Sequence, residues 1–151
     1  MLIKGPTQRK PQMSSKPTSR IPKPARSFVQ ILVVEDDIPV RVALEHVLAR
    51  AQYKVISAKT AEEAVRLLHR TSFDLLVTDV KLPGVDGIEL ARQARANNPG
   101  LPILVFSGVP DPGLETRALG AGATLFLRKP LGAQELSGTV AAMLERRGRV
   151  L

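Results

Sequence analysis

The sequence predicts an α/β protein: a doubly wound, three-layer sandwich of five β-then-α units around a five-stranded parallel sheet. Five short apolar runs of strand length alternate with stretches whose apolar residues recur at helical spacing. The runs are apolar throughout, which is typical of parallel strands buried on both faces. Right-handed crossovers then place helices on both sides of the sheet. The length of 151 residues suits one domain, and the lack of Cys excludes a disulfide scaffold.

Local signals define the first two units. Residues 29–34 form an apolar, β-branched run that predicts a strand, and Pro39 suits the first turn of the helix that follows. Residues 54–57 predict a second, shorter strand. Thr60 and Glu63 have the spacing of a capping box, which predicts the beginning of a second helix.

The remaining three units continue the alternation. Asn-Asn-Pro-Gly stops the third helix, and Gly120 and Gly122 end the fourth. We predict strands at residues 74–78, 102–106 and 124–127, and helices at 87–97, about 112–119 and around Leu136 to Leu144.

The formal net charge of +8 is concentrated at one end of the chain. Residues 1–28 carry seven basic residues, five prolines and no acid, whereas 29–151 hold 15 basic and 14 acidic residues. We predict a disordered basic arm over 1–28, a domain over 29–147 and a tail over 148–151. The arm offers only Phe28 for base stacking, so we expect no nucleic-acid partner. No apolar run approaches the roughly 18 residues of a membrane span, so we expect no membrane partner either.

Chemically active side chains follow four of the predicted strands. They are Glu35-Asp36-Asp37, Asp79, Ser107 and Arg128-Lys129-Pro130. Because the carboxyl ends of parallel strands lie on one edge of the sheet, we expect these side chains to converge there. Clustered carboxylates repel one another unless a cation is present, and Mg²⁺ prefers such oxygen ligands. An Asp beside Mg²⁺, a Lys and a hydroxyl suits the acceptance of a phosphoryl group.

Each of these residues, taken alone, also has an ordinary structural interpretation. Asp36 and Asp37 can cap the first helix, and Asp79 can be a turn residue. Lys129 can be a solvated surface charge, and Glu35 can be either a third acid of the ligand sphere or a solvated neighbour. These interpretations explain the residues singly but do not explain their convergence on one edge.

Four motifs in order resemble the receiver domain of bacterial two-component response regulators. They are Val33-Val-Glu-Asp-Asp37, Asp79-Val-Lys-Leu-Pro-Gly-Val-Asp-Gly87, Val105-Phe-Ser-Gly108 and Gly122-Ala-Thr-Leu-Phe-Leu-Arg-Lys-Pro130. The resemblance spans about residues 29–147. It implies a flavodoxin-like fold with the strand order 2-1-3-4-5.

The resemblance also implies a metal site. Asp37 is then the direct carboxylate ligand of Mg²⁺, and Asp36 binds the ion through water. Asp79 and the backbone carbonyl of Lys81 complete the ligands, and Mn²⁺ can substitute for Mg²⁺.

The same resemblance implies a phosphorylation chemistry and a switch. Asp79 is then the phosphoacceptor, and Lys129 pairs with the phosphoryl oxygens. Ser107 bonds a phosphoryl oxygen after the reaction, and Phe126 turns inward as that hydroxyl moves. The Lys129–Pro130 peptide bond is expected to be cis.

These roles imply a regulatory domain in a phosphorelay that catalyses only its own phosphorylation and dephosphorylation. A histidine kinase or a histidine phosphotransfer protein is the expected donor, and a downstream protein is the expected target. The resemblance also allows a homodimer through the fourth helix, fifth strand and fifth helix, and implies a cytoplasmic location. Alternatively, the chain is the receiver fragment of a hybrid histidine kinase or of a DNA-binding transcription regulator.

Two positions bear on the lifetime of the phosphoryl group. In the receiver family, the residues two beyond the phosphoacceptor and two beyond the hydroxyl influence it, and here they are Lys81 and Val109. Neither offers a carboxylate or an amide that could position an attacking water, so we expect slow autodephosphorylation.

Overall fold

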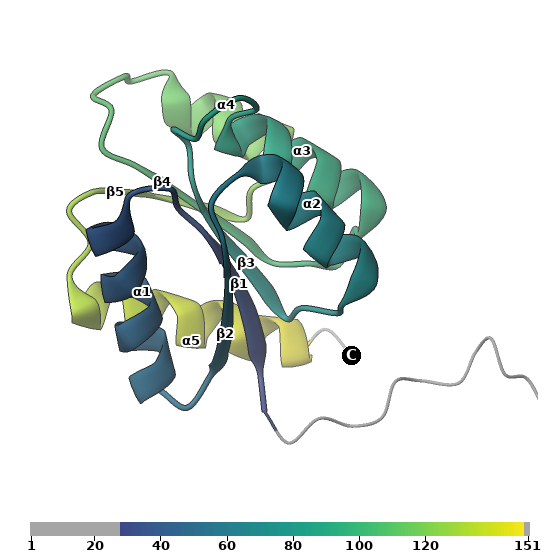
Figure 1. The fold of residues 1–151 in the computed structure, drawn as a ribbon, viewed down its shortest axis with the longest axis vertical. Coiled ribbons are helices and arrows are strands. Elements are labelled where there is room, and N and C mark those ends of the chain that lie inside the picture. The colour runs from purple at the N-terminus through teal and green to yellow at the C-terminus, as the bar shows by residue number, and fades with distance from the viewer. Residues whose placement is uncertain (1–27, 150–151) are drawn as a thin grey trace, which may run out of the picture.

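The computed structural model describes residues 28–149, in which five strands and five helices alternate along the chain (Figure 1). The strands are β1 (Gln30–Val34), β2 (Lys54–Ala58), β3 (Leu75–Asp79), β4 (Ile103–Ser107) and β5 (Leu125–Arg128). The helices are α1 (Ile38–Arg50), α2 (Ala61–Arg70), α3 (Gly87–Asn97), α4 (Leu114–Ala121) and α5 (Ala133–Arg149). The arm predicted over 1–28 lies outside the described residues except for Phe28. No helix in the described part of the chain is long and apolar enough to cross a membrane.

All strands are parallel and form one sheet in the order β2-β1-β3-β4-β5. This arrangement confirms the flavodoxin-like fold class and the strand order. The registers bring the strand ends level, since Val34 pairs with Thr78, Asp79 with Phe106, and Ser107 with Arg128. The carboxyl ends of the three central strands and of β5 therefore share one edge.

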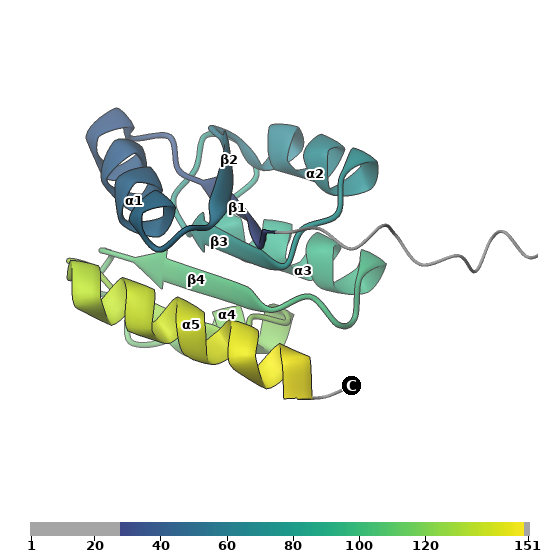
Figure 2. The ribbon, with the colours of Figure 1, turned by 90° about the horizontal axis from the view of Figure 1, so that it is seen from below.

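Helices cover both faces of the sheet, with α1 and α5 on one side and α2, α3 and α4 on the other (Figures 1 and 2). Successive residues of a strand point to opposite faces. In β1, Ile31 and Val33 accordingly pack with α1 and α5, whereas Leu32 and Val34 pack with the other three helices. Two cores need two apolar faces, and this is why the central strands β1, β3 and β4 are mostly apolar on both faces.

Side-chain caps position the helices that flank the functional edge. The Oγ1 atom of Thr60 accepts from the backbone N–H of Glu63 at 3.1 Å, as the capping box predicts. The Glu63 carboxylate reaches back to the N–H of Lys59 at 2.9 Å, one residue earlier than the cap itself. Asp86 caps α3 by accepting from the N–H of Glu89 at 2.9 Å.

Two helix boundaries differ from those predicted. Helix α4 begins at Leu114 rather than near Pro112, because Asp111 holds the preceding residues in a turn by accepting from the Gly113 N–H at 2.9 Å. It ends at Ala121, where Gly122 takes a φ of +118°. Helix α5 continues to Arg149, through the first residues of the tail predicted at 148–151.

Candidate functional site

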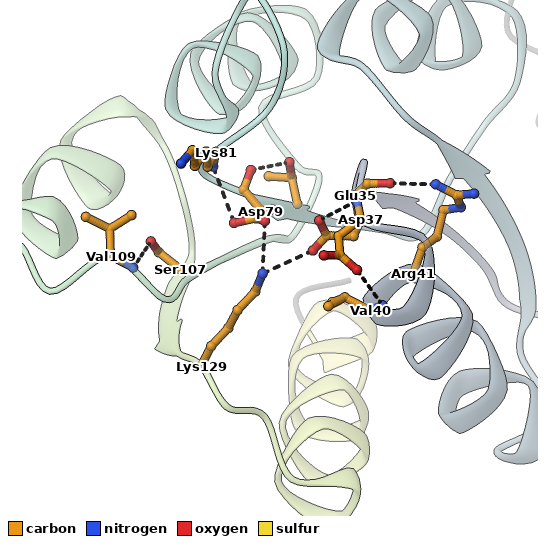
Figure 3. Close-up of polar contacts among 10 residues, drawn as sticks. Glu35, Asp37, Val40, Arg41, Asp79, Lys81, Ser107, Val109 and Lys129 are labelled. Atoms are coloured by element: carbon orange, nitrogen blue, oxygen red, sulfur yellow. Dashed lines mark hydrogen bonds and ion pairs between the residues drawn. The ribbon is translucent and has the colours of Figure 1, made fainter.

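The carboxyl edge of the sheet brings together side chains from four strand ends (Figure 3). Glu35 follows β1, Asp79 ends β3, Ser107 ends β4 and Lys129 follows β5. Glu35, Asp79 and Ser107 are buried, which is unusual for such polar groups unless they have partners. Their convergence agrees with the expectation drawn from the strand ends.

Lys129 is the centre of the polar contacts at this edge. Its Nζ lies 3.0 Å from Oδ2 of Asp79 and 3.2 Å from Oε1 of Glu35, so one ammonium bridges two carboxylates (Figure 3). The same atom lies 5.1 Å from the centre of the Phe106 ring, a cation–π distance. Lys129 therefore is not a free surface charge but a fixed positive charge beside Asp79.

Burial and charge change the protonation of this group of residues. Burial is the main cause that raises the pKa of Glu35 to about 7, and the neighbouring charge of Asp79 adds to it. Burial lowers the pKa of Lys129, but its contacts with Asp79 and Glu35 outweigh this effect and raise that pKa above its usual value. The lysine accordingly stays charged at neutral pH.

The acidic cluster consists of Glu35, Asp36 and Asp79, and one carboxylate oxygen from each lies within 4.8 Å of the other two. Asp36 is exposed, and the other two are buried. Three carboxylates at this separation, with one ammonium to balance them, form an oxygen-rich set that fits a hard divalent cation. The donor set therefore fits the Mg²⁺ or Mn²⁺ that the resemblance implies.

Asp37, which the sequence analysis expects to be the direct metal ligand, lies outside this cluster of the described residues. Its Oδ1 accepts from the N–H of Val40 at 3.2 Å and caps α1, which begins at the next residue (Figure 3). Its own N–H donates to Oε2 of Glu35 at 3.1 Å. The helix begins immediately after Asp37, so its carboxylate serves the helix end and Glu35 takes the place in the cluster.

The loop between β3 and α3 forms one wall of the site. The backbone N–H of Lys81 donates to Oδ1 of Asp79 at 3.3 Å. The backbone carbonyl of Lys81, the expected metal ligand, belongs to the same loop between β3 and α3. Gly87 closes this loop by donating its N–H to the carbonyl of Val80 at 2.7 Å. A Cβ atom at position 87 would lie 1.9 Å from the carbonyl oxygen of Asp79. Only glycine fits there.

The residues assigned to the switch lie beside the site. The Oγ atom of Ser107 accepts from the N–H of Val109 at 3.0 Å (Figure 3). Phe126 on β5 is buried, and the guanidinium of Arg128 lies 5.3 Å from the centre of its ring. The Lys129–Pro130 peptide bond is cis, as expected.

An apolar groove that sequence reasoning did not find adjoins the site. It has a volume of about 530 Å³ and lies between α1 and the segment that follows β5, and its lining includes Val40, Val47, Leu131 and Lys129. Ile38 and Val42, also on α1, expose 62% and 52% of their surface. The apolar residues of α1 were the sequence feature that could have indicated the groove. The amphipathic pattern of α1 is weak, however, so the sequence does not show which of these residues are buried and which are exposed.

Comparison with known proteins identifies the family. Residues 31–141 match the family model of the response regulator receiver domain. The chain belongs to this family, the receiver domain of two-component response regulators.

Individual relatives agree with this assignment. The chain is 37% identical over 118 residues to the response regulator MprA of Mycobacterium leprae, covering 78% of this chain and 52% of MprA. It thus spans about half the length of that curated relative. A CheY-like receiver domain protein from Methanospirillum hungatei has a TM-score of 0.80 at 27% identity, covering 83% of this chain and all of the other. The beryllofluoride-activated NtrC4 receiver domain dimer has a TM-score of 0.74 at 27% identity, covering 78% and 98%.

Proposed function

We propose that this receiver domain accepts a phosphoryl group on Asp79 from a histidine kinase or a histidine phosphotransfer protein. One observation carries the proposal: the carboxylate of Asp79 lies within 3.0 Å of the Lys129 ammonium and inside the acidic cluster of Glu35 and Asp36. Glu35 and Asp79 are the two buried carboxylates among the described residues, and both contact the Lys129 ammonium. Of the two, Asp79 begins the segment that resembles the phosphoacceptor motif.

In the reaction, a carboxylate oxygen of Asp79 attacks the phosphorus of a phosphohistidine. The new bond joins that oxygen to phosphorus as the phosphorus–nitrogen bond breaks, and its electron pair returns to the imidazole nitrogen of the donor. Lys129 neutralises the transferring oxygens. The contacts that raise the pKa of Lys129 keep it protonated for this role.

We place the metal on Glu35, Asp36, Asp79 and the backbone carbonyl of Lys81. Asp37, which caps α1, is left out of this set. When bound, Mg²⁺ or Mn²⁺ supplies Lewis-acid neutralisation of the phosphoryl oxygens. Binding also offsets the repulsion between the carboxylates, which Lys129 alone balances in the metal-free cluster.

We further propose that phosphorylation shifts the population between two states. The hydroxyl of Ser107 leaves the N–H of Val109 and bonds a phosphoryl oxygen, and Phe126 packs into the space behind it. Because Phe126 lies on β5 between α4 and α5, the change reaches the α4–β5–α5 face. This face is the proposed contact for a downstream protein or a second copy, and the NtrC4 receiver dimer supports the second option.

The apolar groove beside Lys129 is the proposed docking face of the phosphoryl donor. A partner seated in it holds its phosphohistidine near Asp79, because Lys129 both lines the groove and contacts Asp79. The exposed side chains of Ile38 and Val42 extend this apolar surface along α1. We also propose that the protein acts in the cytoplasm, as the resemblance to receiver domains implies.

A second candidate is that the chain is the receiver part of a longer regulator. The MprA relative supports it, since the chain matches 52% of that protein. The chemistry proposed for Asp79 is the same in both cases, and only the output differs.

The proposal is tested with a small acyl phosphate, which needs no docking face. Incubation with this donor and Mg²⁺ should add the mass of one phosphoryl group to the wild-type protein and none to Asp79→Asn. Lys129→Met should slow the addition about 10²-fold, because one stabilising charge at the transferring group is lost. Addition to Asp79→Asn at the wild-type rate would contradict the proposal.

A further inference from the structure

Arg41 lies at the end of the first turn of α1, where helix stability does not explain a cation. The positive end of the helix dipole lies at this turn and disfavours a positive charge. The carboxylate of Asp37 caps the helix and makes no ion pair with Arg41 among the described residues. The Arg41 side chain is half-buried rather than free in solvent. Its role therefore depends on what its guanidinium contacts.

The guanidinium of Arg41 donates to the backbone carbonyl of Glu35 at 3.0 Å (Figure 3). Glu35 follows β1 directly, and its own N–H donates to the carbonyl of Ala58, the last residue of β2, at 3.1 Å. The chain after Ala58 leaves the sheet to begin α2, so β2 offers the Glu35 carbonyl no donor among the described backbone contacts. A buried carbonyl without a donor is costly, and Arg41 supplies the donor.

This hydrogen bond fixes the turn that carries Asp36, the exposed member of the acidic cluster. Within the described chain no group donates to the Asp36 carboxylate, so its place is set by the backbone of the turn. That backbone is held on both sides of Asp36. The N–H of Asp37 donates to Oε2 of Glu35 at 3.1 Å, and Arg41 holds the Glu35 carbonyl.

Arg41 and Lys129 act on Glu35 in different ways. Lys129 contacts the Glu35 carboxylate at 3.2 Å, whereas Arg41 contacts the backbone carbonyl. Figure 3 shows the Arg41 guanidinium on the side of Glu35 that faces away from Asp79. A cation that balanced the charge of the cluster would face its carboxylates, as Lys129 does. The contact of Arg41 thus orients the turn instead of neutralising the cluster.

We propose that Arg41 is a positioning residue for the divalent cation: its bond to the Glu35 carbonyl holds Glu35 and Asp36 in the arrangement that binds Mg²⁺. This inference rests on the metal placement of the proposed function. Mg²⁺ requires near-octahedral geometry, so its affinity is sensitive to the direction of each carboxylate. Groups that orient metal ligands typically change the affinity by about 10- to 100-fold when they are removed.

The sign of the effect separates positioning from simple electrostatics. If Arg41 acted through its charge, its removal would relieve a repulsion on the metal and strengthen Mg²⁺ binding. If it acts through the turn, its removal weakens binding.

The test titrates the full chain with Mn²⁺ and follows the electron paramagnetic resonance signal of the free ion, with Mg²⁺ as a competitor. Arg41→Met keeps an apolar stem without a donor and should bind at least about tenfold more weakly than wild type. Arg41→Lys should keep most of the affinity, because a single nitrogen makes the contact. Arg50→Met makes the same charge change at the exposed end of α1 and should leave the affinity unchanged.

Two further readouts separate positioning from a general loss of stability. In the presence of a chelator, the N–H of Asp37 should exchange hydrogen faster in Arg41→Met than in wild type or Arg50→Met. With a small acyl phosphate, Arg41→Met should need more Mg²⁺ for half of its maximal rate, and that maximal rate should be near that of wild type. Circular dichroism confirms that the variants fold, and Arg41→Ala, with a better helix former, replaces Arg41→Met if that variant is unstable.

Three outcomes would overturn the positioning role. They are equal Mn²⁺ affinity of wild type and Arg41→Met, tighter binding by Arg41→Met, and equal weakening by Arg41→Met and Arg50→Met. Each of them leaves the phosphoryl chemistry of Asp79 intact. Absence of Mn²⁺ binding by the wild-type protein would instead overturn the metal placement itself, and this inference with it.

Discussion

Glu35 is the side chain whose environment departs most from that of an ordinary carboxylate. It is 0% exposed, accepts from the N–H of Asp37, and contacts Lys129. Burial raises its pKa to about 7 from an ordinary 4.5. Since the folded state then binds the proton more tightly than the unfolded chain, Glu35 contributes stability below about pH 4.5. That contribution is lost as pH rises through about 7.

Glu35→Gln tests this linkage in the metal-free protein. Gln keeps the shape but carries no charge, so the variant should gain stability relative to wild type between about pH 5 and pH 8. The gain should be on the order of 1–3 kcal/mol. Urea unfolding in the presence of a chelator measures it, and a difference between the two proteins that is the same at both pH values would contradict the raised pKa.

Lys81 and Val109 determine the expected lifetime of the phosphoryl group. Both are exposed next to the site, where the N–H of Lys81 contacts Asp79 and that of Val109 contacts Ser107. Neither side chain can hold an attacking water, so loss of the phosphoryl group should be slow. Intact mass followed over time measures the decay after the donor is removed. A wild-type half-life of seconds would refute this expectation, and Val109→Glu should shorten the lifetime.

At the residue scale, the sequence identified the right edge but not every residue of the cluster. A run of three acids, Glu35, Asp36 and Asp37, offers two adjacent pairs, and the spacing does not choose between them. The choice depends on where β1 ends and where α1 begins, and these boundaries can shift by one residue in a sequence analysis. The structure ends β1 at Val34 and makes Asp37 the cap.

At the element scale, α1 contributes the docking face that the proposed function requires. Val42→Glu places a charge on the exposed apolar surface beside the groove and should reduce phosphotransfer from a histidine donor at least about tenfold. Phosphorylation by a small acyl phosphate should be unchanged. Ala49→Glu, exposed at the far end of the same helix, is the matched control. Equal loss with both donors would mean that the substitution damages the site rather than docking.

Arg95 links α3 to the connection between α4 and β5. Its guanidinium donates to the carbonyl of Gly122 at 2.8 and 3.0 Å and to that of Pro99 at 2.9 Å. Arg95→Ala should lower the free energy of unfolding by about 1–3 kcal/mol, because the partly buried carbonyl of Gly122 loses its donors. Arg92→Ala removes an exposed arginine that pairs with Glu89, and should cost at most about 1 kcal/mol. Equal effects in urea unfolding would contradict the role of Arg95.

The presence of each helix and strand could be predicted from the sequence, because hydrophobic periodicity and capping residues act locally. Thr60 with Glu63 marked α2, and Pro39 marked α1, before any tertiary contact was considered. The start of α4 was not predictable, because the turn at Asp111 depends on a side-chain bond to Gly113 that propensity does not reveal. The groove between α1 and the segment after β5 depends on packing, and residue types alone do not reveal it.

At the scale of the whole molecule, charge is divided between two ends of the sheet. Glu35, Asp36 and Asp79 cluster at the carboxyl edge, whereas the exposed cations Arg50, Lys54 and Arg70 lie where α1 ends, β2 begins and α2 ends, at the amino edge. The alternation of strands and helices predicted the parallel sheet from the residues themselves. The order β2-β1-β3-β4-β5 came from the family resemblance, because apolar patterning does not specify which strands are neighbours.

The most direct test of the central claim is phosphotransfer from a phosphorylated histidine kinase or phosphotransfer protein, with the modified residue mapped by peptide mass spectrometry. With Mg²⁺ present, the account predicts one phosphoryl group on Asp79 and none after a chelator is added. The Asp36→Asn variant should also lose most of the transfer, whereas Asp37→Asn should retain it. Phosphorylation of another residue, or transfer that persists in Asp79→Asn, would contradict the account.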